Sequence, residues 1–360
     1  MNKKAIKSLS LIELEELSLS LGQPRFRGKQ LYQWLFAKGV SSFDEMSNLP
    51  IAFRGALAEA YEVKTLDISH MQTSSIDGTI KCLFRLNSGR AIETVLIPGF
   101  DDEGDASRLT VCVSSQVGCA MGCSFCATGQ MGFLQNLHAG EIFDQVLEMN
   151  RLAQTNYGRK ITNIVFMGMG EPLQNYDQVL RSIRLLTSPD GMGLASRRIT
   201  LSTVGLAARI KKLADDGAKF NLAISLHAPT AAKRSEIMPV NRSLKTDLSA
   251  LKEAVQYFYQ STKSRITYEY CIFDHFNDGE EDALALAKIV RWAPSKVNLI
   301  MFNPVKGVQF EASREQRLNA FIRILVAQKV TVTVRRSKGQ DIDAACGQLA
   351  IGEQEKAETV

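Results

Sequence analysis

The sequence has no run of about 18 consecutive apolar residues, so we expect no membrane-spanning helix. Its first residues lead into glutamates without an apolar run, so we do not expect a secretory signal peptide there. A reducing cytoplasm suits free thiols, and we expect the protein there. Short repeats and low-complexity tracts are absent as well. The seven cysteines are odd in number and mostly clustered, which argues against the disulfide framework of a secreted domain.

The length and the hydrophobic content of the chain are sufficient for a folded protein of more than one domain. The chain has 360 residues, of which 45% are hydrophobic, and this favours one large domain with a smaller one beside it. The formal net charge of +5 is mild. It permits binding to nucleic acid but does not by itself predict such binding.

Three of the cysteines gather in one short segment. Cys119, Cys123 and Cys126 stand within the sequence CAMGCSFC. Thiolates bind soft metals, and iron–sulfur clusters are held by such cysteines. Because only three are local, a [4Fe–4S] cluster here would leave one iron open to a substrate. The alternative is a structural zinc site with a distant fourth ligand such as His138, but no second Cys-x-x-Cys or Cys/His unit exists, so the cluster is favoured.

The pattern of apolar residues divides the chain into four parts. Leucines at helical spacing predict a small helical domain over residues 1–62. Residues 63–104 predict an antiparallel hairpin or meander, which ends in an acidic linker at 99–107. An α/β core follows over residues 105–340. Residues 341–360 form a polar C-terminal loop and tail.

Within the core, strands and helices alternate. Strands are predicted at 109–113, 161–167, 198–203, 220–226, 265–273, 297–302 and 330–335, and helices at 140–152, 176–186, after 205, and at 248–259, 282–292 and 314–327. Repeated βα units imply a parallel sheet with helices outside. Six full units are fewer than the eight of a closed barrel, so we predict an open, partial (βα)6 barrel.

Polar residues follow these strands at the edge where ligands bind in such sheets. The cysteine segment comes after the first strand, and Gly168–Glu171 comes after the second. Ser202, His227 and Asn303 stand at the ends of the third, fourth and sixth strands. Each alone would be a strand-end cap. Their convergence on one rim predicts a functional site there.

Five motifs, in order, resemble the RlmN/Cfr family of radical S-adenosylmethionine (SAM) methyltransferases of RNA adenine. They are CVSSQVG at 112–118, CAMGCSFCATG at 119–129, GMGEP at 168–172, SLH at 225–227 and DIDAACGQL at 341–349. The resemblance spans nearly the whole chain. It implies a radical SAM barrel with a [4Fe–4S] cluster whose open iron chelates SAM. It also implies that SAM is contacted by Gly170, Glu171, Ser202, Ser225, Leu226, His227 and Asn303.

The resemblance assigns roles to three further residues. It implies that Cys346 is methylated, that Cys112 releases a covalent protein–RNA adduct through a transient disulfide with Cys346, and that Glu93 is the proton acceptor. A thiolate accepts the methyl group of one SAM by ordinary displacement, whereas the carbon of adenine is not nucleophilic. A second SAM supplies a 5′-deoxyadenosyl radical that takes hydrogen from the S-methyl group. Without the family, Glu93 would be an exposed strand carboxylate.

By resemblance, the product is 2-methyladenosine at position 2503 of 23S rRNA and position 37 of tRNAs. The N-terminal helical domain would help to hold RNA, and the basic residues Arg335, Arg336 and Lys338 adjoin the Cys346 loop, where a phosphate backbone could pass. An external one-electron donor such as flavodoxin and a monomeric state are expected. Two alternatives stay open, namely Cfr-type methylation of C8 of the same rRNA adenine, and a non-enzymatic zinc-containing RNA-binding protein.

Overall fold

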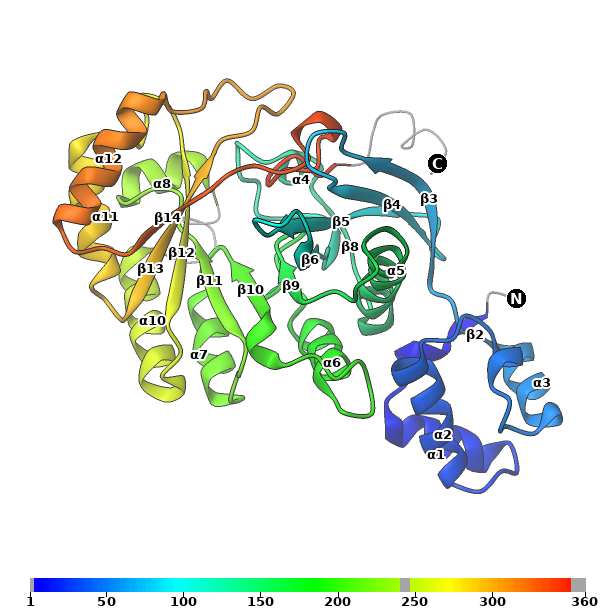
Figure 1. Cartoon of the computed structure of the whole chain (residues 1–360). Helices are drawn as coiled ribbons and strands as arrows, with labels where there is room; N and C mark the ends of the chain where they lie inside the picture. Colours follow the sequence, from blue (N-terminus) through cyan, green and yellow to red (C-terminus); the bar gives the residue numbers. More distant parts are fainter. Residues whose placement is uncertain (1–2, 240–246, 351–360) are drawn as a thin grey trace.

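The centre of the molecule is a ten-stranded sheet in the order β14-β13-β12-β11-β10-β9-β6-β5-β4-β3 (Figure 1). The computed structural model describes residues 3–239 and 247–350. The end of the predicted C-terminal tail, 351–360, lies outside these ranges. Within them, no helix is long and apolar enough to cross a membrane.

Seven strands of this sheet, β6 and β9 to β14, are parallel to one another and form the predicted partial barrel. They are β6 (Ala106–Cys112), β9 (Asn163–Phe166), β10 (Ile199–Thr203), β11 (Asn221–Ser225), β12 (Ile266–Ile272), β13 (Ser295–Met301) and β14 (Val332–Arg335). The predicted helices between them are α5 (Ala139–Tyr157), α6 (Tyr176–Thr187), α7 (Ala207–Asp215), α10 (Leu248–Thr262), α11 (Glu280–Val290) and α12 (Glu315–Ala327). The prediction of six βα units and a last strand is therefore confirmed.

Shorter elements that the sequence pattern did not predict lie between the longer ones. After the carboxyl ends of strands come β7 (Gln116–Gly118), α4 (Ala127–Gln130), β8 (Phe133–Asn136), α8 (Ala231–Ile237) and the 3₁₀ turn η5 (Gln340–Ile342), whereas the 3₁₀ turn η4 (Ser196–Arg198) directly precedes β10. The pair β7 and β8 flanks the cysteine segment as a small antiparallel ribbon. Such short elements lack the periodicity that reveals longer ones.

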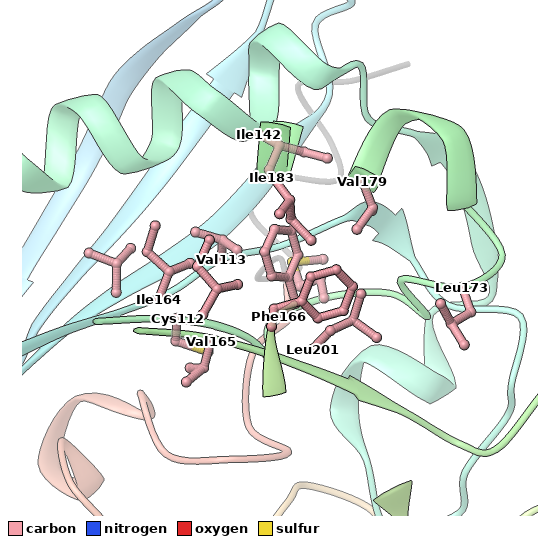
Figure 2. Packing of buried hydrophobic residues seen from close by; sticks show 14 of the residues in the cluster. Cys112, Val113, Ile142, Ile164, Val165, Phe166, Leu173, Val179, Ile183 and Leu201 are labelled. Carbon is pink, nitrogen blue, oxygen red and sulfur yellow. The ribbon is translucent and has the colours of Figure 1, made fainter. Parts of the chain in front are cut away.

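Alternation along the strands determines which side chains face the helices and which face the barrel interior. Figure 2 shows Val113, Ile164 and Phe166 on the side of the sheet that packs against α6, and Cys112 on the other side. Cys112 pairs in register with Val165. These residues are buried, because parallel strands are covered on both faces. Cys112 is thereby directed into the barrel.

The antiparallel extension consists of β3 (Leu66–Thr73), β4 (Ile80–Leu86) and β5 (Ala91–Phe100), and it continues the sheet beyond β6. The predicted linker at 99–107 is wrong, because Phe100 pairs with Ala106 and the chain turns only between these two residues. Asp101 stabilises that turn by accepting the backbone N–H of Asp105 at 2.9 Å. The acidic residues form a hairpin turn, so the extension and the barrel share one sheet.

The N-terminal residues form a helical unit beside this sheet (Figure 1). Its elements are β1 (Lys4–Ala5), η1 (Ile6–Ser8), α1 (Leu11–Ser20), α2 (Phe26–Tyr32), η2 (Gln33–Lys38), η3 (Phe43–Glu45), α3 (Ile51–Ala60) and β2 (Tyr61–Glu62). A capping box of Ser10 and Glu13 starts α1. The buried Lys7 ammonium lies 2.5 Å from the carboxylate of Asp144 on α5 and so ties the unit to the barrel.

Candidate functional site

A cavity of about 140 Å³ lies at the carboxyl ends of the parallel strands. All three cysteines of the predicted cluster line it. Predicted SAM-binding residues from three neighbouring strand ends line it as well, namely Gly170, Glu171, Ser202, Ser225 and His227, and Cys346 lies on its wall. The structure therefore brings together residues that are spread over most of the chain.

The cysteine segment is held in place by its backbone. The Ser124 N–H donates to the carbonyl of Ile237 at 3.0 Å, and the Ala127 N–H donates to the carbonyl of Gly347 at 2.8 Å. Burial raises the pKa of Cys119 to about 12, and burial together with the neighbouring thiols raises the pKa of Cys123. Three thiolates around one cavity require a cationic centre to offset their charge, which a metal cluster provides. Cys119, Cys123 and Cys126 are thus a fitting donor set for a [4Fe–4S] cluster.

The zinc alternative lacks a matching ligand set. Across residues 3–239 and 247–350, no three Cys, His, Asp or Glu side chains converge at the spacing of ligands to a single metal ion. His138 stands at the start of α5, where its backbone N–H donates to the carboxylate of Glu141 at 2.7 Å, and it does not line the cavity. A cluster of four irons accepts thiolates that are farther apart than those around one zinc ion.

Glu171 is buried at the cavity wall, 2% exposed. Its two carboxylate oxygens accept the backbone N–H groups of Leu173 at 3.0 Å and Val204 at 2.8 Å. Burial raises its pKa to about 7, against the effect of these hydrogen bonds. A cationic group bound in the cavity would favour the ionised carboxylate.

Gly170 is required by a close approach of two segments. Its φ is 98°, in the region that favours glycine, and a Cβ there would stand 2.5 Å from the side chain of Gln116. The side-chain oxygen of Gln116 accepts the N–H of Glu171 at 2.8 Å. The glycine therefore lets the loop after β9 pack against the segment that leads to the cysteines.

Ser202 and Ser225 end adjacent strands, and their hydroxyl oxygens lie 3.1 Å apart. His227 follows β11 with φ of 55°, an uncommon conformation for a residue other than glycine. Burial and the nearby Arg234 lower its pKa to about 3, so the ring is neutral. Its Nδ1 accepts the N–H of Cys271 at 3.0 Å, which leaves the proton on Nε2 as a donor. The ring of Phe125 packs edge-on against it at 4.9 Å.

Two predicted SAM-binding residues do not line this cavity. Leu226 is fully buried, and its backbone N–H donates to the carbonyl of Glu269 at 3.0 Å. Asn303 lies against the C-terminal loop, where its amide N–H donates to the carbonyl of Cys346 at 3.3 Å and its oxygen accepts from Gln340 at 3.0 Å. In this structure Asn303 therefore holds the Cys346 loop.

Cys346 stands between two cavities. It lines the cluster cavity, and it also lines a second cavity of about 60 Å³ together with Cys112 and Arg335. Burial raises the pKa of Cys112 to about 12. Cys346 is exposed as a residue, although burial of its thiol among the surrounding atoms raises its pKa, and Arg335 opposes that rise. The predicted methyl carrier thus faces the cluster on one side and the predicted resolving thiol on the other.

The C-terminal loop, residues 336–350, is held by the turn between β3 and β4, beside which it lies in Figure 1. Asp77 accepts the N–H of Gly339 at 2.9 Å, and Asp341 accepts the N–H of Ser75 at 3.0 Å. On its far side the Thr128 hydroxyl donates to the carbonyl of Leu349 at 2.5 Å. The antiparallel extension and the cysteine segment therefore both position Cys346.

Glu93 of β5 lies beneath this loop and is 5% exposed. One carboxylate oxygen accepts the N–H of Ala350 at 2.8 Å, and the other lies 3.1 Å from the ammonium of Lys81. Its carbonyl accepts from the hydroxyl of Ser114 at 2.6 Å, and that hydroxyl in turn accepts the N–H of Met169 at 2.9 Å. The structure thus places Glu93 between the Cys346 loop and the loop of Glu171, and not on the surface.

Sequence reasoning missed several residues of this site. Cys271 lines the cluster cavity, and Phe125 packs on His227, and no sequence motif points to either role. Lys81 pairs with Glu93, a contact between two strands that the sequence pattern does not reveal. In the sequence, Lys81 stands out only as a lysine between apolar neighbours in β4, and this does not identify the residue with which it pairs.

Comparisons with known proteins agree with this geometry. Residues 5–63 match the ribosomal RNA large subunit methyltransferase N-terminal domain, and residues 113–287 match the radical SAM superfamily. A protein of Salinibacter ruber named probable dual-specificity RNA methyltransferase RlmN is 58% identical over 96% of this chain and 93% of its own length. A protein of Flavobacterium psychrophilum with the same name is 45% identical over 97% of this chain and 98% of its own length. The crystal structure of a radical SAM methyltransferase from Sphaerobacter thermophilus superposes with a TM-score of 0.89 at 43% identity, covering 96% of this chain and 99% of that one.

Proposed function

Because the chain belongs to the RlmN family of radical SAM methyltransferases, we propose that it methylates C2 of adenine 2503 in 23S rRNA and of adenine 37 in tRNAs. The cofactors of this family are a [4Fe–4S] cluster and SAM. The relatives' names specify RNA as the substrate and two specificities. The observation that carries the proposal is the position of Cys346, which lines both the cluster cavity and the cavity of Cys112.

This position suits a carrier of the methyl group. The C2–H of adenine is neither acidic nor nucleophilic, so C2 cannot attack the methyl group of SAM directly. The thiolate of Cys346 accepts that methyl group by displacement. The bound cluster and SAM supply the radical chemistry that removes one hydrogen atom from it. The resulting carbon radical bonds to C2, the unpaired electron that this leaves on the ring would pass to the [4Fe–4S] cluster, and protein and RNA are then covalently joined.

Release requires the two remaining predicted residues. The carboxylate of Glu93 takes the proton from C2. The thiolate of Cys112 attacks the sulfur of Cys346, so that a disulfide forms and the bond between sulfur and the methylene carbon breaks. The electron pair of that bond stays on the carbon, which takes a proton and becomes the methyl group of the product. The two thiols are returned by an external reductant of the thiol class.

We propose the following setting for this reaction. Residues 1–62 are an RNA-binding accessory domain, 63–104 an extension, 105–340 the radical SAM core, and 341–360 the segment that carries the methyl acceptor. The match of residues 5–63 to an rRNA methyltransferase domain supports the first assignment. The protein acts as a monomer in the cytoplasm, and a flavodoxin-type protein delivers single electrons. The basic side chains of Arg336 and Lys338, at the edge of the second cavity, contact the RNA backbone.

Methylation of C8 of the same rRNA adenine is the second candidate, since the thiol chemistry does not by itself select the carbon. The relatives are named RlmN, the type within this family for which the sequence resemblance implies C2. Nucleoside mass spectrometry with authentic standards distinguishes 2-methyladenosine from 8-methyladenosine after reaction with an rRNA fragment. Detection of 8-methyladenosine alone would overturn the assignment to C2.

Cys112→Ala tests the covalent route. We expect this variant to methylate Cys346 and to join it to RNA, but not to release the product, because no thiol attacks the Cys346 sulfur. Denaturing gels should then show a protein–RNA species that survives boiling, and it should be absent from the Cys112→Ala, Cys346→Ala double variant. Cys82→Ala is the matched control, since Cys82 is fully buried in β4 and lines neither cavity. Normal turnover by Cys112→Ala without an adduct contradicts the proposed resolving role.

A further inference from the structure

Lys81 and Glu93 form an ion pair on one face of the antiparallel extension. In the β4–β5 register Lys81 stands opposite Val95, and Glu93 stands opposite Leu83, so the two side chains are diagonal neighbours on the same face. Their charged atoms lie 3.1 Å apart, and the side chains are only 12% and 7% exposed. A lysine in this setting is held by its partners, unlike the solvated lysines of most strands.

The pair lies under the loop that carries Cys346. The Lys81 ammonium also donates to the backbone carbonyl of Asp343 at 3.4 Å, and the second Glu93 oxygen accepts from Ala350 at 2.8 Å. Asp343 and Ala350 stand three residues before and four residues after Cys346. Lys81 therefore contacts both the acid–base carboxylate and the loop of the methyl carrier.

A buried carboxylate without a cation nearby favours its protonated form, and a protonated carboxyl cannot accept a proton. An ammonium at this distance favours the ionised form. It also fixes one oxygen of the carboxylate in place. The ion pair thus supplies both conditions that a general base needs, which are ionisation and orientation.

We propose that Lys81 is a positioning residue for proton removal from the adenine ring, acting through Glu93. This inference rests on the proposed function, in which Glu93 accepts the proton from C2. Lys81 does not touch the thiols or the cluster cavity, so it serves the step after the RNA adduct has formed. Formation of methyl-Cys346 does not need it.

The test is a single-turnover reaction with an RNA fragment in which three species are followed: methyl-Cys346 by peptide mass spectrometry, the adduct on denaturing gels, and the free methylated RNA. For Lys81→Met we expect methyl-Cys346 to form as in the unchanged protein, and the adduct to persist because its release is at least about tenfold slower. Lys81→Arg, which keeps the cation, should restore release. Lys64→Met is the control, because Lys64 pairs with Asp67 at an exposed position of the same extension.

A second comparison shows whether Lys81 acts through Glu93. Glu93→Gln should give the same persistent adduct, and adding Lys81→Met to it should slow release no further. A further slowing by the same factor would mean that Lys81 acts independently, and loss of methyl-Cys346 in Lys81→Met would mean that it only supports the fold. Either result overturns the inference, as does normal release by Lys81→Met. Cys112→Ala serves as the reference: if it forms no adduct, the proposed function itself is wrong, whatever Lys81 does.

Discussion

The site has two regions that are assembled in different ways. The cluster cavity is lined mainly by residues from the loops that come after parallel strands, including Cys119, Glu171 and His227. The transfer region, by which we mean Lys81, Glu93, Cys112 and the loop of Cys346, joins the antiparallel extension to a segment far along the chain. The hydrogen bond between Glu93 and Ala350 spans 257 residues of sequence.

The two regions differ in how general they are: the cluster cavity is a feature of the barrel, and the transfer region is particular to this protein's arrangement of strands. The cluster cavity belongs to the partial barrel, which positions ligands at strand ends whatever the later reaction is. The transfer region exists only because β5 pairs with β6 and so places the extension beside the barrel mouth. In the proposed function, generation of the radical and delivery of the methyl group therefore depend on separate parts of one sheet.

The strongest test of this separation compares one thiol from each region. Cys126→Ala should lose the cluster and with it all cleavage of SAM, because it removes one of the three thiolate ligands. Cys346→Ala should retain the iron and sulfide of the unchanged protein but yield no methylated RNA, because it removes only the methyl acceptor. Chemical assay of iron and sulfide, together with chromatography of 5′-deoxyadenosine and of RNA nucleosides, measures both effects.

The comparison fails if the two variants behave alike. Turnover of RNA by Cys346→Ala would remove this thiol from the transfer region. Cleavage of SAM by Cys126→Ala would remove Cys126 from the ligand set.

A smaller effect is expected where the extension holds the C-terminal loop. Asp77 accepts the backbone N–H groups of Thr79 at 3.0 Å and Gly339 at 2.9 Å. Asp77→Ala should loosen the loop by about 1 kcal/mol, since the carboxylate is half-buried and partly screened by water. We expect RNA methylation to slow by up to about tenfold at unchanged iron content. Hydrogen exchange of residues 337–350 should rise, and Asp67→Ala on the same extension should change neither quantity.

The pH dependence of this contact has a definite sign. Burial opposes ionisation of Asp77, but hydrogen bonds from Thr79 and Gly339 outweigh it, and its pKa is lowered. A carboxyl group with a lowered pKa stabilises the folded state above its ordinary pKa of about 3.9, and this contribution is lost as the pH falls through its lowered value. Protection of the loop amides against hydrogen exchange, corrected for the intrinsic effect of pH, should therefore be constant near neutral pH and decline in acid. Greater protection in acid would contradict the role of the hydrogen bond between Asp77 and Gly339.

The smallest effect should come from the N-terminal unit, outside both regions. Ser10→Ala removes the side-chain oxygen that accepts the N–H of Glu13 at 3.2 Å and caps α1. Loss of such a cap costs about 1 kcal/mol, which for a protein of this length lowers the melting temperature by only a few degrees. Thermal unfolding followed by circular dichroism measures the shift. Cluster content and the rate per folded molecule should remain unchanged, and a selective loss of methyl transfer would show that this unit shapes the transfer region.

The sequence by itself determined the barrel, and it predicted the cluster ligands. The spacing of Cys119, Cys123 and Cys126 is a property of eight consecutive residues, and the alternation of strands and helices places the residues after each strand on one rim. These inferences need only local chain geometry and the rule that parallel strands end at the same edge. The position of Glu171 at the cavity wall followed from them.

Only the tertiary structure decided the transfer region. The acidic segment at 99–107 has the composition of a linker, and pairing of Phe100 with Ala106 makes it a turn within the sheet. The pairing of Lys81 with Glu93 depends on the register of β4 and β5, since a slip of one residue would place them on opposite faces. The approach of Cys346 to Cys112 depends on the return of the last loop across the barrel mouth. Contacts between such distant segments depend on how the whole sheet packs, so they cannot be inferred from the local order of residues.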